Sequence, residues 1–306
     1  KKLLIIGIMP PPIGGVTIYV QRLTKWLKTN EIKYYFSDIR KDPLLKILIG
    51  ILRVEIVHIN LSRPIVILAL VLLSRLFLSK VIVTMHRNLD DKIKIGKMQN
   101  LILDFAIKYS TLVLVLNKNS KERAYSLNNS TKLISSYLPA TKDEINEEGL
   151  SDVITSITTS TKIVVSTNAF DVTFDDDNNE IYGITKLIIW AIKNDYLLVV
   201  SDPSGKYYSW IKQIFPNLLC PNVLFVSFAH NFVVILKYVD FFIRNTTTDG
   251  DSISIHEALD SGVRVYATNC VSRPENVVVY DDLDKVKLTS NVKSNIIKST
   301  SSMDTM

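Results

Sequence analysis

Two carboxylates stand eight positions apart in the stretch DGDSISIHEALDSGVRVYATN, which begins at Asp249. Asp249 falls in an expected loop, and Glu257 falls inside a helix expected over residues 252–262. Ser252 and Ser254 lie near the helix start, where hydroxyl oxygens cap free N–H groups. A pair of carboxylates can accept hydrogen bonds from neighbouring hydroxyls of a sugar or ribose, while the free amides take a phosphate. A capped helix with acids near its positive end would show the same residues.

A glycine pair, Gly14 and Gly15, is the second candidate site, in the sequence MPPPIGGVTIYVQRL. A strand is expected to end near Met9, and the glycines open a helix expected over residues 14–29. Glycines let a ligand approach the backbone closely, and the free N–H groups of a helix start favour an anion. The spacing differs from that of a dinucleotide fingerprint or a P-loop, so the pair does not indicate NAD or ATP. A purely structural turn is the alternative.

His58 and His86 each stand at the end of an expected buried strand, the edge at which parallel sheets bind ligands. Without further context, a histidine in such a place is a structural residue. The four histidines are scattered, and Cys220 and Cys270 lie in different segments, so neither a metal-ligand spacing nor a disulfide framework emerges. No metal or other cofactor is therefore expected, and the two thiols fit a reducing compartment.

The chain has 306 residues, of which 47% are hydrophobic, and a formal net charge of +6. This length exceeds what one hydrophobic core usually fills, so two domains are expected. The charge is compatible with an ordinary basic surface or with anionic partners such as nucleoside diphosphates and lipid headgroups. Nucleic-acid binding is not expected, because the basic residues form no dense run and are not interleaved with aromatic ones.

The most apolar stretch, residues 64–78, is too short to span a bilayer, and Ser74 and Arg75 interrupt it. The N-terminal run KKLLIIGIM lacks the longer apolar region and the cleavage site of a signal peptide. These observations predict a cytoplasmic protein whose membrane contact, if it has one, is peripheral and at the inner face of the cell membrane.

Short runs rich in Val and Ile alternate with segments of helical period, which is typical of parallel sheets covered by helices. The pattern predicts an α/β fold with two doubly wound, Rossmann-like domains that face each other across a cleft. The expected strands cover residues 3–8, 54–59, 80–85, 111–116, 163–167, 196–201, 223–228, 239–244 and 263–268. The expected helices cover residues 14–29, 64–78, 97–110, 181–194, 205–215 and 252–262.

The alternation breaks in residues 138–162, which are polar, acidic in their first half and rich in Ser and Thr. Such a break is typical of a connection between domains. The expected divisions are an N-terminal domain over 1–140, a linker over 141–160, a C-terminal domain over 161–285 and a polar tail over 286–306.

The stretch DGDSISIHEALDSGVRVYATN and the RPE that follows it resemble the donor site of retaining glycosyltransferases of the GT-B architecture. The resemblance is to glycosyltransferase family 4 in particular, of the kind that assembles capsule, O-antigen or exopolysaccharide. PPPIGGVTIYVQRL looks like that family's N-terminal glycine loop, IVHIN and VTMHRN resemble its strand-end histidine segments, and NEIYGITKLIIWAI resembles a helix of its second domain. The resemblance covers most of residues 1–280.

The resemblance implies a role for each matching residue. Glu257 would hold the ribose hydroxyls, Asp249 the hydroxyls of the transferred sugar, and His86 would contact the donor sugar near the reacting carbon. These three are therefore the expected catalytic residues, while Gly14 and Gly15 would approach the diphosphate from the N-terminal domain. The backbone amides expected to face the sugar and diphosphate belong to Gly250, Asp251, Ser252, Ile253 and Ser254.

One departure concerns the arginine and lysine that usually clamp the diphosphate in this family. Asn168 and Tyr182 stand at those positions here, so charge-assisted stabilisation of the leaving group is missing. Arg244, at a strand end, and Arg273, in RPE, flank the donor loop and are the first candidates to replace the lost cations. Further candidates are Arg87 and Lys206.

Together these implications describe an enzyme that transfers a sugar with retention from a nucleoside-diphosphate sugar, expected to be UDP-linked, to a glycan or lipid-linked glycan. The acceptor would lie on the N-terminal domain. Two alternatives stay open: a nucleotide-sugar epimerase or phosphorylase of the same architecture, and a non-catalytic binding protein that lost the diphosphate clamp. Turnover of the donor separates the enzymes from the binding protein, and dependence on an acceptor separates the transferase from the epimerase.

Overall fold

The structure is a computed structural model in which residues 2–89 and 96–289 are described. The chain divides into two compact units. The first unit takes in the chain up to Pro139 together with the segment Thr248–Ile253. The second unit takes in Ala140–Thr247 and the described chain from Ser254 onward. Each unit is a separate α/β body and is described by itself.

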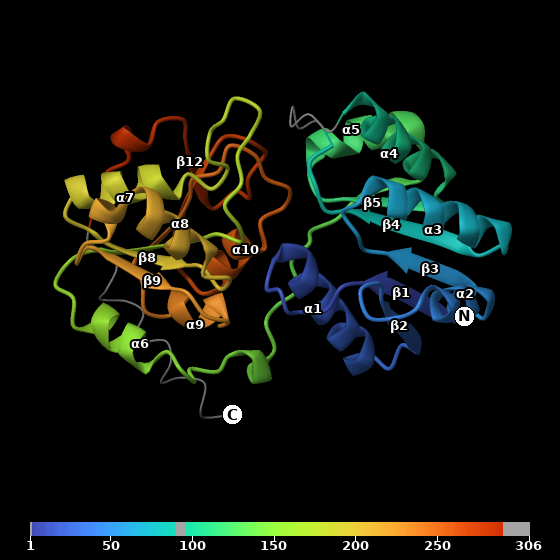
Figure 1. The fold of residues 1–306 in the computed structure, drawn as a ribbon, viewed down its shortest axis with the longest axis horizontal. Helices are drawn as coiled ribbons and strands as arrows, with labels where there is room; N and C mark the ends of the chain where they lie inside the picture. The colour runs from blue at the N-terminus through green and yellow to red at the C-terminus, as the bar shows by residue number, and fades with distance from the viewer. Residues whose placement is uncertain (1, 90–95, 290–306) are drawn as a thin grey trace. The chain divides into compact units, whose positions relative to one another are not determined.

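The first unit is built on a parallel sheet that has six strands within the described residues (Figure 1). These strands are β1 (Leu3–Gly7), β2 (Tyr34–Asp38), β3 (Ile56–Ile59), β4 (Lys80–Met85), β5 (Leu112–Val115) and β6 (Thr131–Leu133). Their order across the sheet is β2-β1-β3-β4-β5-β6, and every pair is parallel. Most of the strands are continuous apolar runs because both faces of the sheet are covered.

Helices cover both faces of this sheet, since each crossover between parallel strands must pass over it. The helices are α1 (Gly15–Thr29), α2 (Leu44–Leu52), α3 (Pro64–Leu76), α4 (Lys97–Tyr109) and α5 (Lys118–Leu127). Helix α1 buries Tyr19 and Val20 in a small separate cluster. Helices α2 to α5 share the main core of the unit, which includes Ile51, Ile67 and Ile107. The outer sides of α2, α3 and α4 are therefore turned away from the sheet.

The second unit repeats the plan with another parallel sheet, also of six strands in the part of the chain that is described. Its strands are β7 (Val164–Asn168), β8 (Leu197–Ser201), β9 (Val223–Val226), β10 (Phe241–Arg244), β11 (Arg264–Thr268) and β12 (Val277–Tyr280). The order is β12-β11-β10-β7-β8-β9 (Figure 1). Both sheets and the helices around them confirm the predicted α/β class with two Rossmann-like domains.

Two apolar cores lie on the opposite faces of this second sheet. The helices are α6 (Ser151–Thr158), α7 (Ile184–Lys193), α8 (Lys206–Ile214), α9 (Phe232–Leu236) and α10 (Ile253–Asp260). One core joins α6, α9 and α10 to side chains such as Phe242 of β10. The other joins α7 and α8 to side chains such as Phe241, the preceding residue. Consecutive residues of β10 thus fill opposite cores, which is the period-two geometry of a strand.

In each sheet the order of the strands reverses beside the first strand. The chain passes from β1 to β2 on one side and returns to β3 on the other, and β7, β8 and β10 repeat this arrangement. In open α/β sheets, ligands bind outside the carboxyl ends of the strands at such a reversal. The ends of β1 and β3, and the ends of β7 and β10, are therefore the places where a site is expected.

The segment expected to be a linker has structure of its own. It contains a short 3₁₀ turn, η1 (Lys142–Glu144), followed by α6. Val153 and Ile157 of α6 are buried in the core of the second unit. This segment is thus packed against the second sheet.

The expected polar tail begins with packed residues, since Val286 and Leu288 are buried beside the core that holds α7. Its remainder, residues 290–306, lies outside the described residues. Among the helices that are described, none combines the length and the apolar character needed to cross a bilayer.

Candidate functional site

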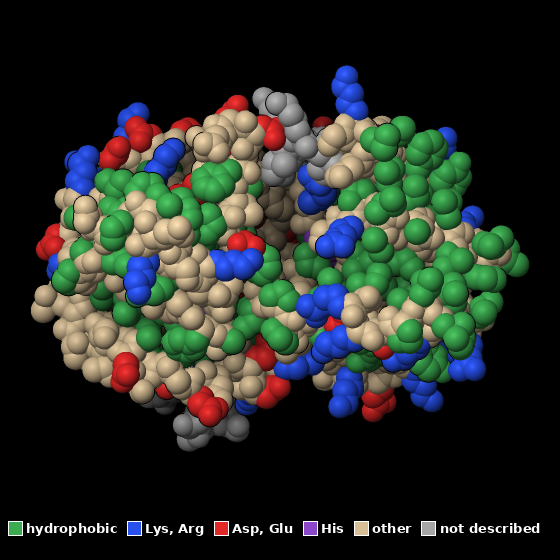
Figure 2. Space-filling model, viewed as in Figure 1, with side chains coloured by type: hydrophobic (Ala, Val, Ile, Leu, Met, Phe, Trp, Pro, Cys, Tyr) green, Lys and Arg blue, Asp and Glu red, His purple; other side chains and the backbone are tan. Residues whose placement is uncertain are grey.

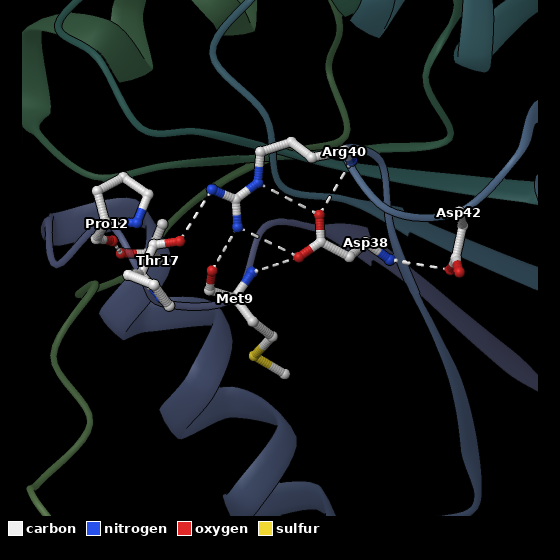
Figure 3. Close-up of polar contacts among 7 residues, drawn as sticks. Met9, Pro12, Thr17, Asp38, Arg40 and Asp42 are labelled. Carbon is white, nitrogen blue, oxygen red and sulfur yellow. Dashed lines mark hydrogen bonds and ion pairs between the residues drawn. The ribbon is translucent and has the colours of Figure 1, made fainter.

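The loop that follows β1 is held by two side chains at the end of β2 (Figure 3). The Asp38 carboxylate accepts hydrogen bonds from the backbone N–H of Met9, at 3.1 Å, and from the Arg40 guanidinium. Arg40 also donates to the carbonyl oxygens of Met9, at 2.6 Å, and Pro11, at 2.9 Å. Burial opposes ionisation of Asp38, but the hydrogen bonds from Arg40 and Met9 hold its pKa below the usual value. The loop is thereby fixed in place at the switch point of the sheet.

The two glycines of this loop stand at the start of α1. Thr17 accepts a hydrogen bond from the Gly14 N–H at 3.0 Å and donates its hydroxyl to the Pro12 carbonyl at 2.7 Å. A Cβ added to Gly15 would meet no atom of the described residues within 4 Å. Packing therefore does not require glycine at residue 15, whereas a ligand that approaches the helix start would.

Two histidines meet at the carboxyl ends of β3 and β4. Burial lowers the pKa of His58 to about 4, and burial together with the nearby His58 lowers the pKa of His86 to about 3. His86 Nε2 lies 3.2 Å from Asn60 Oδ1, His58 Nε2 lies 2.8 Å from Thr84 Oγ1, and the Tyr19 ring packs edge-on against His86. A ring with so low a pKa is a poor general base at neutral pH. It remains a neutral hydrogen-bonding group.

The loop Thr248–Ile253 packs within the first unit although its neighbours in sequence belong to the second. The Asp251 carboxylate accepts hydrogen bonds from the Ser136 N–H at 2.7 Å and from the Ser135 hydroxyl at 2.9 Å. The Ser136 hydroxyl donates to the Asp251 carbonyl at 3.0 Å. A Cβ on Gly250 would lie 2.9 Å from the His86 carbonyl oxygen, so only glycine fits there without a shift. The predicted donor loop is thus anchored beside His86.

The other predicted donor residues lie just before α10 and in its first two turns. Ser252, Ile253, Ser254 and Glu257 are all buried, and Glu257 is only 6% exposed. Asp249 is half-buried in the preceding loop. Ser254 and Glu257 belong to the second unit, while Asp249 belongs to the first. A carboxylate as deeply buried as Glu257 requires hydrogen-bonding partners.

Arg244 bridges the switch point of the second sheet. It is the last residue of β10, is 8% exposed, and donates from Nη1 to the carbonyl oxygen of Asn168 at 3.3 Å and to its Oδ1 at 3.2 Å. Asn168 is the last residue of the neighbouring β7. The Arg244 guanidinium also lies over the Tyr182 ring, 5.1 Å from its centroid. The two positions that lack the usual cations are therefore both in contact with one buried arginine.

The start of α7 lies against the end of β10 through a required glycine. Gly183 has a left-handed backbone with φ of 56°, and an added Cβ would lie 2.4 Å from Asn245 Nδ2 and 2.6 Å from its carbonyl oxygen. Asn245 Nδ2 donates to the Gly183 carbonyl at 3.1 Å, and its Oδ1 accepts from Tyr280. The Glu180 carboxylate accepts from the N–H groups of Ile184 at 2.7 Å and Thr185 at 3.1 Å. The protein itself thus satisfies two amides of this helix start.

Arg273 lies at the ends of β10 and β11. Its Nε donates to the Thr268 carbonyl at 3.0 Å, and its Nη2 lies 3.4 Å from Thr246 Oγ1 and 3.2 Å from Cys270 Sγ. These contacts hold Arg273 near the chain that leads out of β10. The structure thus gathers both first-ranked arginines on one edge of the second sheet.

The other two candidate cations are Lys206, the first residue of α8 after β8, and Arg87 in the first unit. Lys206 forms an ion pair with Asp171. Arg87 follows His86 in the first unit and contacts the Asn88 carbonyl. No cluster of three or more His, Cys, Asp or Glu side chains is arranged to hold a metal in residues 2–89 and 96–289.

Several residues that organise these edges were not predicted from the sequence. Asn60 directly follows β3 and Thr84 is the last residue but one of β4, and these positions near strand ends were the available signal. Ser135 and Ser136 contact Asp251 across more than a hundred residues of sequence, so local pattern carries no signal for them. Glu180 precedes the N-cap residue Gly183 by three residues, which is not a capping-box position; the only signal was an acid close to a helix start.

Comparison with solved structures finds chains of the same two-domain design. HepE from Anabaena, solved in complex with UDP-glucose, has a TM-score of 0.68 at 14% identity, over 98% of this chain and 90% of that chain. Sucrose-phosphate synthase from Thermosynechococcus elongatus has a TM-score of 0.68 at 13% identity, over 93% and 87%. UDP-GlcNAc 2-epimerase from Methanocaldococcus jannaschii has a TM-score of 0.58 at 12% identity, over 93% and 90%.

The chain therefore has the GT-B fold. Identities this low establish the fold and leave the activity to be argued from the site. No family model matches the sequence, and no curated protein matches it. The likeness to glycosyltransferase family 4 stays a prediction.

Proposed function

We propose that this protein is a glycosyltransferase that transfers a sugar from a nucleoside-diphosphate sugar, with UDP as the preferred nucleotide and with retention at the transferred carbon. The observation that carries the proposal is Arg244, a buried cation at the switch point of the second sheet. Buried charge is costly unless it serves a partner, and a diphosphate is the natural partner for a cation at the carboxyl edge of such a sheet. The bound UDP-glucose of the similarly folded HepE supports the choice of nucleotide.

In this proposal Arg244 replaces the absent clamp. Its guanidinium stays charged at any working pH and can bind two phosphate oxygens at once. Arg273, held by Thr246 and Thr268 on the same edge, is the second cation. Tyr182 orients Arg244 from one side, as Asn168 does from the other. Charge on the leaving diphosphate would be stabilised by these groups as it develops.

The remaining predicted residues would hold the sugar nucleotide by its hydroxyl groups. Glu257 would accept from the ribose, and Asp249 from the transferred sugar. His86 would contact that sugar as a neutral ring, which suits its low pKa better than proton abstraction does. Gly14, Gly15 and the amides of residues 250–254 would face the sugar and the diphosphate. No metal is assigned a role.

We further propose that the acceptor is a glycan or lipid-linked glycan, as in the assembly of capsule or a related polysaccharide. The acceptor would bind the first unit, and the enzyme would work in the cytoplasm at the inner face of the cell membrane. The conversion of a lipid-linked glycan extract in the presence of donor, followed by mass spectrometry, tests this assignment.

The central test is UDP binding to Arg244→Gln, measured by isothermal titration calorimetry. The substitution removes a charge-assisted contact, so the affinity for UDP should fall by about 10- to 100-fold. Glu257→Gln should weaken the binding of UDP, and it should matter far less for inorganic pyrophosphate, which has no ribose.

Arg264→Gln is the matched control. Arg264 also lies over a tyrosine ring in the second sheet, that of Tyr266, but it is the first residue of its strand. It therefore stands at the opposite end of the sheet, and its loss should leave UDP binding unchanged. Circular dichroism melts check that each variant is folded. A folded Arg244→Gln protein that binds UDP as wild type does would refute the role of Arg244.

A non-catalytic binding protein is the second candidate, and the Glu180 carboxylate at the start of α7 favours it. That carboxylate already satisfies two amides that could otherwise help to hold an anion, and it adds negative charge near the clamp. Release of UDP from UDP-sugars by wild type would exclude this candidate. The similarly folded epimerase suggests epimerisation as a third candidate function. An absolute requirement for an acceptor would exclude it.

A further inference from the structure

The first unit exposes a broad apolar surface on the outer sides of α2, α3 and α4. The three helices bury their inner sides in one core, and α3 packs directly against α4. Figure 2 shows hydrophobic side chains gathered over this part of the unit, with Lys and Arg side chains among and around them. Its more exposed large residues include Leu45, Leu52, Leu72, Leu76, Met98 and Leu101. We call this surface, together with Phe77 and Leu78 at the end of α3, the apolar face.

The charge around the apolar face is strongly positive. The described residues between 44 and 109 include eight Lys and Arg but only two acids, Glu55 and Asp104. The Asp104 carboxylate forms an ion pair with Arg123 at 2.8 Å, so its negative charge is compensated. Exposed cations include Arg53 and Lys108 at the ends of α2 and α4, and Lys80 at the start of β4.

This local excess is part of a larger imbalance along the chain. Residues 1–139 carry 22 Lys and Arg against 8 Asp and Glu, a formal charge of +14. Residues 140–306 carry 14 Lys and Arg against 22 Asp and Glu, a formal charge of −8. A net charge of +6 for the whole chain therefore hides a strongly basic first part, and the apolar face belongs to it.

At the end of α3, a large apolar side chain is exposed at a position whose backbone conformation favours glycine. Leu78 has a left-handed backbone with φ of 60°, and its side chain is 92% exposed. The N–H of Leu78 bonds to the Arg75 carbonyl, and that of Ser79 bonds to the Ser74 carbonyl. This is the helix ending at which glycine is the usual residue, because a side chain is strained there. A leucine at this position places a large apolar group in solvent on a strained backbone.

We propose that the apolar face docks on an anionic lipid bilayer, with Leu76, Phe77 and Leu78 inserting into the headgroup region. Apolar side chains provide the partition energy, and the surrounding cations provide the attraction to anionic headgroups. A second copy of this chain is the less suitable occupant, because a two-fold contact would set this basic surface against itself. The inference deepens the peripheral location proposed above by naming the surface, and it rests on that proposal for its biological setting.

The test is co-flotation of the protein with vesicles of phosphatidylcholine alone or with about 30 mol% phosphatidylglycerol. Wild type should bind the anionic vesicles at low salt, bind the neutral ones weakly, and lose binding as salt rises. The double variant Leu76→Ser, Leu78→Gly should lose on the order of tenfold or more of the affinity. Because Leu78→Gly relieves backbone strain, this variant should fold well, which thermal melting verifies.

Two further variants separate the contributions. Lys80→Gln with Lys108→Gln should lower binding to the anionic vesicles while keeping the weak binding to the neutral ones. Ile189→Ser, which removes an exposed apolar side chain of α7 in the second unit, should bind as wild type does. UDP titration of every variant reports on the donor site independently, so loss of docking and loss of nucleotide binding are distinguishable.

Three results would overturn the proposal. Wild type would fail to bind anionic vesicles, or the Leu76→Ser, Leu78→Gly variant would bind them as wild type does. In the third, analytical ultracentrifugation would show a dimer of wild type that this variant abolishes, without any vesicle binding. That last result would make the apolar face an interface between copies of the chain.

Discussion

At the scale of single residues, the candidate site residues include one buried, charged arginine and two histidines that burial keeps neutral. Arg244 is a buried cation whose guanidinium contacts Asn168 and the Tyr182 ring, which offset part of the cost of its burial. His58 and His86 are kept neutral by burial. The second sheet thus carries a fixed cation at its carboxyl edge, whereas the first sheet carries uncharged rings at its own.

The two histidines predict how stability depends on pH. Their pKa values in the folded protein, about 4 and about 3, lie below the value of 6.5 expected in the unfolded chain. Below pH 6.5 the unfolded chain takes up protons that the folded protein refuses, so stability is full above this pH and falls as the pH drops towards 4. Each histidine should lower the free energy of unfolding by about 1.4 kcal/mol per pH unit in that range.

Urea unfolding at a series of pH values between 7 and about 4 measures this dependence. His58→Gln should reduce the slope by about half, because one of the two titrating rings is removed. An unchanged slope in that variant would show that other groups, such as the carboxylates, cause the loss of stability.

At the scale of elements, the carboxyl edge of the second sheet depends on the close approach of α7 to β10. Gly183 allows this approach, since its missing side chain leaves room for Asn245. Asn245 in turn links the helix start to Tyr280 of β12. The position of Tyr182, and hence the setting of Arg244, depends on this contact.

Gly183→Ala should therefore destabilise the protein by about 2–4 kcal/mol, from a left-handed backbone and a clash with Asn245. Gly205→Ala is the matched control. Gly205 also has a positive φ, of 70°, but its added Cβ would be 3.5 Å from the nearest atom. It should lose only the backbone contribution, about 1–2 kcal/mol. Chemical denaturation of both variants compares the two, and equal losses would show that the contact with Asn245 is unimportant.

Most of the long apolar elements were predicted from the sequence, but the apolar helices α2 and α9 and the apolar strand β12 were not. The nine expected strands all form, with shifts of a residue or two at their ends. Three strands were missed. β2, with the sequence YYFSD, and the three-residue β6 are not continuous apolar runs, whereas the apolar run VVVY of β12 was overlooked. Helix α5 was missed because it is polar throughout, although the Asn117 side chain caps it by accepting from the Ser120 N–H.

In the candidate site, too, some features could be predicted from the sequence and others could not. Arg244 could be singled out from its place at a strand end, and the structure brings it to both positions that lack the usual cations. Its stacking on the Tyr182 ring could not be predicted, because it depends on how α7 meets β10. The contacts of Asp251 with Ser135 and Ser136 were equally invisible, since they join segments more than a hundred residues apart.

At the scale of the whole molecule, the part of the chain proposed to bind the donor has a net negative charge, as the donor itself does. The part of the chain from residue 140 onward has a formal charge of −8, yet the proposal assigns it a doubly charged diphosphate. This part of the chain contributes no long-range attraction of its own, so local cations must hold the diphosphate there. This is why the loss of Arg244 alone should have so large an effect.

Hydrogen exchange with and without UDP tests which segments of the chain bind the donor. Ligand binding stabilises the segments that it contacts, so protection should rise at the ends of β7 and β10 and in α10. Exchange in α2 and α3 should stay unchanged. Protection confined to the first unit would place the nucleotide away from Arg244 and contradict the proposed site.

The contact between Arg244 and Tyr182 also constrains how this sequence can have changed over time. The resembled family carries lysine where Tyr182 stands, and a lysine there would bring a second positive charge against the Arg244 guanidinium. Tyr182→Lys should therefore impair the protein. Replacing Arg244 first would give a form with neither cation. The two positions are thus expected to tolerate such an exchange only when both are changed together.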